Sequence, residues 1–130
     1  MKKILFLFLW LPVFILSAQN NNIDSLKTAL GSVQSAKDST NILVNLCWGY
    51  RFINAAIARE YGLKALELAQ KNSFREYEVE ALHNIGVTHE AQGNYEQALE
   101  LELKALEFRK EIGDESKTAN TLNEYRNHLR

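Results

Sequence analysis

Residues 82–107 constrain the fold of this chain more than any other stretch of similar length. Apolar residues recur every three or four positions on both sides of the Gly93-Asn94 pair, a spacing typical of two amphipathic helices joined by a tight turn. Small residues stand at Gly86, Ala98 and Ala105, where two antiparallel helices must approach each other closely. The stretch therefore predicts a helical hairpin.

A similar pattern recurs upstream. Ala58–Glu67 aligns with Ala98–Glu107 at a shift of 40 residues, and the helix before each turn aligns at a shift of 39, which puts Cys47 where Gly86 stands. A third copy begins near the C-terminus and stops, with Arg126 at the glycine position. Recurrence at a nearly fixed period indicates hairpins that stack on one another.

The recurring unit resembles the tetratricopeptide repeat, whose pattern is W-x2-L-G-x2-Y…A-x3-F…P. Gly86 and Ala98 match this pattern, whereas Leu82, His89 and Glu102 replace its aromatic residues and the closing Pro is absent. The period exceeds the family's usual length of about 34 residues and is similar to that of repeats in bacterial extracytoplasmic signalling proteins. The resemblance implies an all-α fold, a short right-handed superhelix of helical hairpins.

By this resemblance the chain contains repeats at residues 40–78 and 79–116, followed by a partial repeat or cap at 117–130. Each repeat should close through small residues at the crossing of its helices, together with a tyrosine that begins a second helix. The expected repeat-packing residues are Cys47, Ala58, Ala65, Gly86, Tyr95, Ala98 and Ala105.

Residues 1–18 have the pattern of a secretory signal peptide, with Lys2-Lys3, an apolar run and a small residue before Gln19. We therefore expect a helical repeat domain at residues 19–130 of an exported protein, either periplasmic or secreted. An uncleaved leader that anchors the chain in the inner membrane is the alternative. Apolar spacing also predicts a leading helix over residues 23–36.

Local signals suggest where the other helices begin and end. Polar residues 37–40 predict a break after the leading helix, and Ser73–Glu76 has the spacing of a capping box. Gly93 and Gly113 are expected to take the left-handed conformation that closes a helix, with Asn94 capping the helix that follows.

No residues stand at the spacing that catalysis or metal binding requires. His83 and His89 are six residues apart, on different faces of one helix, whereas a helical pair of metal ligands is separated by four. Serines at helix starts are explained by capping, and the glutamates of residues 96–107 by a solvated face. The net charge of −1 disfavours nucleic acid as a partner, and the lone Cys47 cannot form an internal disulfide. We predict no catalytic residue, no cofactor and no metal.

In tetratricopeptide arrays the first helix of each repeat lines a groove that takes a peptide or a partner helix. Trp48 and Arg51 belong to the residue types most frequent at interface hot spots, although packing of Trp48 against the leading helix is an open alternative. The expected function is that of an exported scaffold that binds a protein or peptide. The alternatives are an N-terminal sensory segment of a longer histidine kinase or transcriptional regulator, and a DNA-binding regulator. The groove residues that the resemblance implies are Asn41, Val44, Trp48, Arg51, Glu80, His83, Val87, Glu90, Asn120, Asn123 and Asn127.

Overall fold

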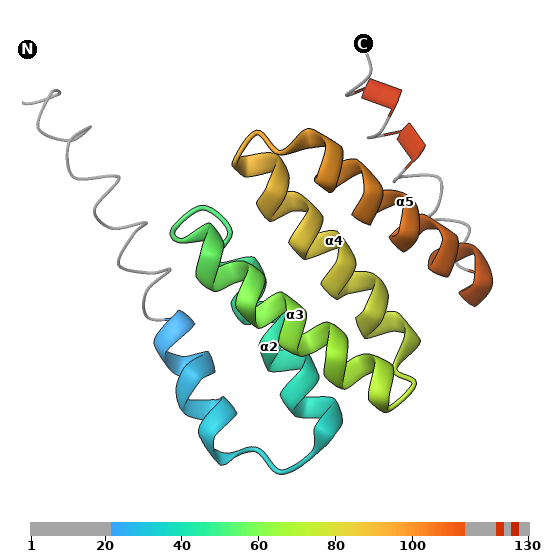
Figure 1. The fold of residues 1–130 in the computed structure, drawn as a ribbon. Coiled ribbons are helices and arrows are strands. Elements are labelled where there is room, and N and C mark those ends of the chain that lie inside the picture. Colours follow the sequence, from blue (N-terminus) through green and yellow to red (C-terminus); the bar gives the residue numbers. More distant parts are fainter. Residues whose placement is uncertain (1–21, 114–121, 124–125, 128–130) are drawn as a thin grey trace, which may run out of the picture.

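A computed structural model describes residues 22–113, 122–123 and 126–127 of the protein. A leading helix covers residues 22–32, and no strand occurs among the described residues, so the expected all-α class is confirmed. Short turns join consecutive helices, which lie as antiparallel neighbours (Figure 1). The helices after the leading one are α2 (Ala36–Tyr50), α3 (Ala55–Lys71), α4 (Arg75–Ala91) and α5 (Tyr95–Ile112).

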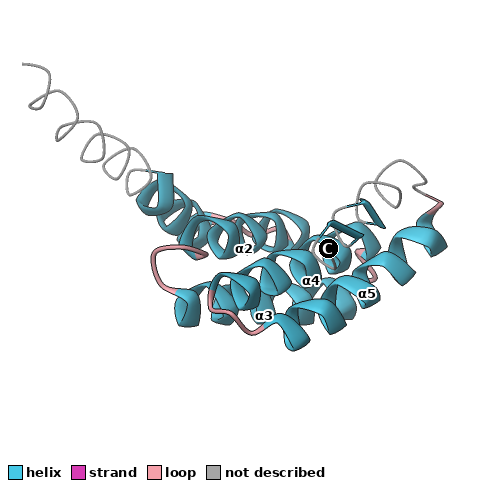
Figure 2. Cartoon of the chain, turned by 90° about the horizontal axis from the view of Figure 1, so that it is seen from above, coloured by secondary structure: helices cyan, strands magenta, loops and turns pink. Residues whose placement is uncertain are grey.

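Contacts between helices follow the order expected of stacked hairpins. Within the labelled helices, α2 packs against α3 and α4, α3 packs against α4, and α4 packs against α5, while the backbones of α3 and α5 are not neighbours. The first helices of the two hairpins therefore meet, and the second helices lie apart. Figure 2 shows the helices following one another along the length of the molecule, from the leading helix to α5. This arrangement presents one face built from α2 and α4.

The expected repeat-packing residues are buried, with one exception. Tyr95 is 67% exposed, so its assignment to the packing was wrong. As the first residue of α5 it directly follows the turn that joins α4 to α5, and its ring is left mostly in solvent. The residues of the set that are buried are Cys47, Ala58, Ala65, Gly86, Ala98 and Ala105.

The two hairpins fill the same contact with opposite pairs of side chains. In the first hairpin Cys47 of α2 faces Gly62 of α3, and a Cβ atom on Gly62 would lie 2.9 Å from the Cys47 Sγ. In the second, Gly86 of α4 faces Glu102 of α5, and a Cβ on Gly86 would lie 3.1 Å from the Glu102 Oε1. The glycine of this contact is therefore on the second helix of the first hairpin and on the first helix of the second hairpin. In sequence Cys47 aligns with Gly86, whereas the role of Gly62 is visible only in the structure.

The break predicted at residues 37–40 is wrong. The leading helix ends at residue 32, and α2 already begins at Ala36, where the Ser35 hydroxyl accepts a hydrogen bond of 3.3 Å from the Asp38 amide. Thr40 is buried within α2, and its hydroxyl donates to the Ala36 carbonyl at 2.7 Å. This local bond satisfies the hydroxyl inside the helix, so a polar residue here does not interrupt it.

The capping box predicted at Ser73–Glu76 is also wrong. Ser73 has a left-handed backbone (φ 57°), and Phe74 takes the N-cap position of α4 without a side-chain cap bond. The Ser73 amide donates to the Gln70 carbonyl and the Phe74 amide to the Ala69 carbonyl, which is the Schellman closure of α3. The backbone of Ser73 thus ends one helix, and its side chain does not begin the next.

The turn between α4 and α5 has the same construction with glycine in place of serine. Gly93 (φ 78°) donates to the Glu90 carbonyl, and the Asn94 amide donates to the His89 carbonyl. The left-handed conformations expected at Gly93 and Gly113 are confirmed. Asn94 occupies the N-cap position of α5, but its side chain makes no cap bond there.

The leading helix packs on α2. Ile23 is buried, and its Cγ1 lies 3.1 Å from the position that a Cβ on Gly49 would take. Leu30 joins the core cluster that contains Leu43 of α2. The expected leader at residues 1–18 and most of the predicted cap at 117–130 lie outside the described residues, within which no helix is long and apolar enough to cross a membrane.

Candidate functional site

Three side chains gather where α2 ends and its turn begins. Trp48 is 42% exposed on the last turn of α2, and Phe52 in the following turn is 71% exposed. The guanidinium carbon of Arg51 lies 3.7 Å from the centre of the Trp48 ring and 4.6 Å from that of the Phe52 ring. Its Nη1 donates to the Trp48 carbonyl at 2.5 Å. The half-buried cation of Arg51 thus lies against two aromatic rings that are themselves exposed.

His83 extends this group onto α4. Its ring is stacked on Trp48, with 6.4 Å between ring centres and 23° between ring planes. The Nδ1 of His83 lies 2.7 Å from the Oε1 of Glu102 on α5. The site therefore joins side chains from α2, α4 and α5. We call Trp48, Arg51, Phe52 and His83 the Trp48 cluster.

The contacts of Trp48 decide between the two interpretations of this residue. Its ring meets Arg51 and His83, whereas the leading helix meets Gly49 and Tyr50 on another side of α2. The Nζ of Lys27 in the leading helix lies 5.8 Å from the centre of the Tyr50 ring. The contacts found for the Trp48 ring are therefore not with the leading helix, and 42% of this residue stays exposed.

Val44 does not fit the groove predicted from sequence. Its side chain is 4% exposed and packs with Leu43, Ala65 and Ala81 in the core. The carbonyl of Val44 accepts a hydrogen bond of 3.2 Å from the Nδ2 of the buried Asn84, which ties α2 to α4. Val44 therefore holds the two helices together beneath the surface that they form.

The other predicted groove residues vary in exposure. Asn41 is exposed on α2, and its Oδ1 accepts a hydrogen bond of 3.1 Å from the Asn45 Nδ2. Asn123 is exposed and accepts a hydrogen bond of 3.0 Å from the Arg126 Nη2, while Asn120 lies outside the described residues. On α4 Glu80 is exposed, and Val87 and Glu90 are half-buried, as His83 is. Asn127 is exposed.

Two members of the site were not predicted. Phe52 follows Arg51 directly, so an aromatic residue at a helix end was the signal that could have included it. Glu102 stands 19 residues after His83, and only the packing of α5 on α4 brings it there.

The second histidine of α4 lies apart from this site. Burial, and secondarily the nearby charge of Arg59, lower the pKa of His89. Arg59 itself hydrogen-bonds the Gln92 side chain, which links α3 to the end of α4. The two histidines thus have separate surroundings, and no group of potential metal ligands occurs in the described part of the chain.

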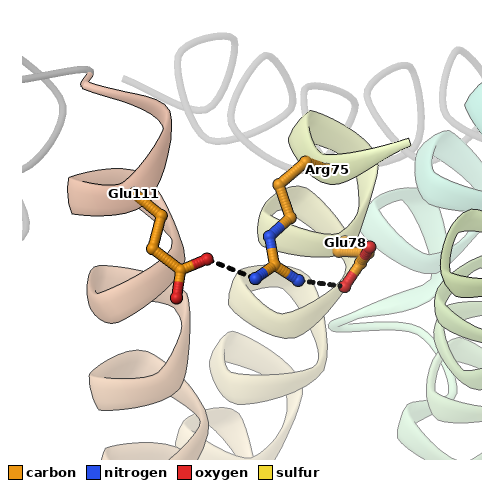
Figure 3. A network of polar contacts seen from close by, with 3 residues as sticks. All are labelled: Arg75, Glu78 and Glu111. Carbon is orange, nitrogen blue, oxygen red and sulfur yellow. Dashed lines mark hydrogen bonds and ion pairs between the residues drawn. The ribbon is translucent and has the colours of Figure 1, made fainter. Parts of the chain in front are cut away.

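A second polar group joins the start of α4 to the end of α5. Arg75 donates from Nη1 to the Glu78 Oε2 at 3.0 Å and from Nη2 to the Glu111 Oε2 (Figure 3). Its guanidinium carbon also lies 3.6 Å from the centre of the Phe108 ring. These hydrogen bonds, that to Glu111 foremost, raise the pKa of Arg75. An adjoining depression of about 610 Å³ is lined by Gln70, Ser73, Arg75, Glu78, Lys104 and Phe108.

The Arg75 group is better explained as a link between helices than as a binding site. Both sides of the guanidinium fork already meet carboxylates, from Glu78 within α4 and from Glu111 across on α5. A partner would have to displace one of them. The Trp48 cluster is consequently the stronger candidate for a functional surface.

Comparison with known proteins agrees with the architecture. The model of the family described as tetratricopeptide repeat matches residues 54–111, which span α3, α4 and α5. No curated protein and no solved structure shows significant similarity to the chain.

Proposed function

We propose that this chain, whose residues 54–111 match the tetratricopeptide repeat family, binds a protein or peptide through the face that α2 and α4 form. Stacked helical repeats build extended surfaces that commonly serve as interaction scaffolds. Such a surface acts by shape, apolar contact and hydrogen bonding, and requires no chemical step. We accordingly regard the protein as a binding module and not as an enzyme.

The exposed Trp48 cluster carries this proposal. Tryptophan and arginine are enriched among the few residues that carry most of the binding energy of protein interfaces, and a tryptophan that is 42% exposed gains by being covered. Trp48 is also held in place before binding, by Arg51 on one side and His83 on another. Preorganisation lowers the entropic cost of association.

A selection experiment tests binding without requiring an identified partner. A random peptide library is displayed on phage and selected on the full chain, and enriched peptides are synthesised with a fluorescent label. Their affinity is then measured by fluorescence anisotropy for the parent, for Trp48→Ala and for Leu63→Ala. Leu63 is a matched control because it is 58% exposed on α3, away from the α2–α4 face.

We expect peptides to be enriched and Trp48→Ala to weaken their binding by about 2 kcal/mol or more, the size of a hot-spot loss. Leu63→Ala should leave the affinity unchanged. If both variants bind as the parent does, the proposed face is not the binding surface. If no peptide is enriched at all, the proposed peptide-binding function fails.

Export is the second part of the proposal. It rests on the leader pattern of residues 1–18, which precedes the leading helix. N-terminal sequencing of protein recovered from outside the cytoplasm should begin at Gln19. Recovery of Met1 in a membrane fraction would favour an anchored form.

A sensory segment of a longer signalling protein is the alternative function. The repeat period of about 40 residues favours it by its similarity to such proteins. The coding sequence beyond Arg130 distinguishes the two, since a continuation in frame with further repeats and a membrane span would support the sensory segment.

A further inference from the structure

We propose that the Trp48 cluster recognises an acidic side chain of the partner peptide, which pairs with Arg51 while an adjacent apolar residue covers Trp48 and Phe52. The inference rests on the proposed function and specifies the chemistry of the partner. Its basis is the positive charge of Arg51, which no carboxylate of the described residues neutralises.

Arg51 is a cation without an anion among the described residues. Its only side-chain hydrogen bond within that part of the chain runs from Nη1 to the Trp48 carbonyl, and no described carboxylate forms an ion pair with it. Its Nε is buried and has no hydrogen-bond partner among the residues that the structure describes. Burial lowers the pKa of Arg51. An arginine partly removed from water and left uncompensated is stabilised by an incoming carboxylate.

Arg75 shows within this same protein how such an arrangement is completed. Its guanidinium also stacks on an aromatic ring, 3.6 Å from the centre of Phe108, against 3.7 Å between Arg51 and Trp48. At Arg75 two carboxylates occupy the guanidinium fork, those of Glu78 and Glu111 (Figure 3). Arg51 has the stacked ring, but no carboxylate from the described part of the chain pairs with it. A carboxylate from a partner would supply the ion pair that Arg75 has and that Arg51 does not have within the described residues.

The neighbours of Arg51 indicate what should flank that carboxylate. Trp48 and Phe52 are the exposed rings on which Arg51 stacks, so a residue next to the acidic one meets an apolar surface. On the other side of Trp48, the carboxylate of Glu102 is engaged by His83. A second acidic side chain would approach Glu102 unfavourably there. The preferred peptide therefore has an acidic residue next to an apolar or aromatic one.

The test uses peptides enriched on the full chain by phage selection. We expect them to contain Asp or Glu beside an apolar residue more often than the unselected library does. Arg51→Gln should weaken binding of a labelled peptide at least tenfold, because it removes a charged hydrogen-bond donor. Raising the NaCl concentration from 50 to 500 mM should weaken the parent complex and have less effect on the variant.

Two controls separate recognition from a structural role. Lys71→Gln removes the same charge from an exposed position at the end of α3 and should leave binding unchanged. Arg51→Lys keeps the charge but loses the planar fork, so it should bind between the parent and Arg51→Gln. Circular dichroism melts establish that each variant is folded. Replacing the acidic residue of the peptide by its amide should cost the parent protein as much as Arg51→Gln does.

Enriched peptides that are neutral or basic would overturn the inference, as would a folded Arg51→Gln that binds with parental affinity. In either case peptide binding itself stands, provided that Trp48→Ala weakens it. Absence of any enriched peptide refutes the proposed function and the inference together.

Discussion

Gly62 provides a direct test of how the first hairpin packs. A Cβ atom at this position would lie 2.5 Å from the Ile85 Cγ1 and 2.9 Å from the Cys47 Sγ, well inside normal contact distances. Both neighbours are buried in one cluster with Ala58, so neither can swing into solvent. Gly62→Ala should therefore force α3 away from α2 and α4.

The magnitude follows from two opposing effects. Overpacking of a core costs about 1–3 kcal/mol, and these distances favour the upper end of that range. Replacing a helical glycine by alanine gains about 0.8–1 kcal/mol. The expected net loss is about 2 kcal/mol, which lowers the melting temperature of a domain of this size by roughly 8–16 °C.

Urea denaturation followed by circular dichroism measures this loss. Gly31→Ala in the leading helix is the matched control, since a Cβ there meets nothing within 4 Å, and it should be neutral or stabilising. The reasoning also predicts coupling with Ile85→Ala, which removes the Cγ1 that the new methyl would strike. The double variant should be more stable than the sum of the single effects by at least about 1 kcal/mol. A Gly62→Ala variant as stable as the parent, or additive with Ile85→Ala, would refute this packing of α3 against its neighbours.

Three further predictions concern particular contacts. Ser73→Gly should stabilise the protein by about 0.5–1 kcal/mol in urea denaturation, because its backbone is left-handed; an unchanged midpoint would contradict this. Burial raises the pKa of Cys47 to about 11. An unfolded thiol ionises near pH 8.5, so stability should fall as pH rises from about 8.5 to 11, with a smaller fall in Cys47→Ala. Gly86→Leu and Ala98→Leu should each lose about 1–3 kcal/mol by overpacking, and melting curves like the parent's would count against the α4–α5 contact.

The sequence by itself determined the hairpins, because the signals for a hairpin are local. Apolar spacing within a helix and glycine at a turn act between residues close in the chain, and the small residues at a crossing recur at a nearly fixed period. Ala58, Ala98 and Ala105 were accordingly recognised as packing residues, and their burial agrees with that assignment. Gly93 was recognised as the end of a helix for the same reason.

Tertiary structure decided the features that depend on contacts distant in sequence. In the sequence Gly62 is only a glycine within a helix, and the structure shows that the Ile85 side chain occupies the space where a Cβ atom would lie. Val44 has the spacing of a groove residue, but Ala65 of α3 packs in the same core cluster and Val44 is buried there. The helix end at Ser73 overrode a capping pattern, because the closure of α3 required a left-handed residue there. The surface at Trp48 likewise depends on packing, since only the contact of α2 with α4 and of α4 with α5 brings His83 and Glu102 to it. Local signals specify where the chain turns, but the residues that meet across helices are selected by the volume left between them.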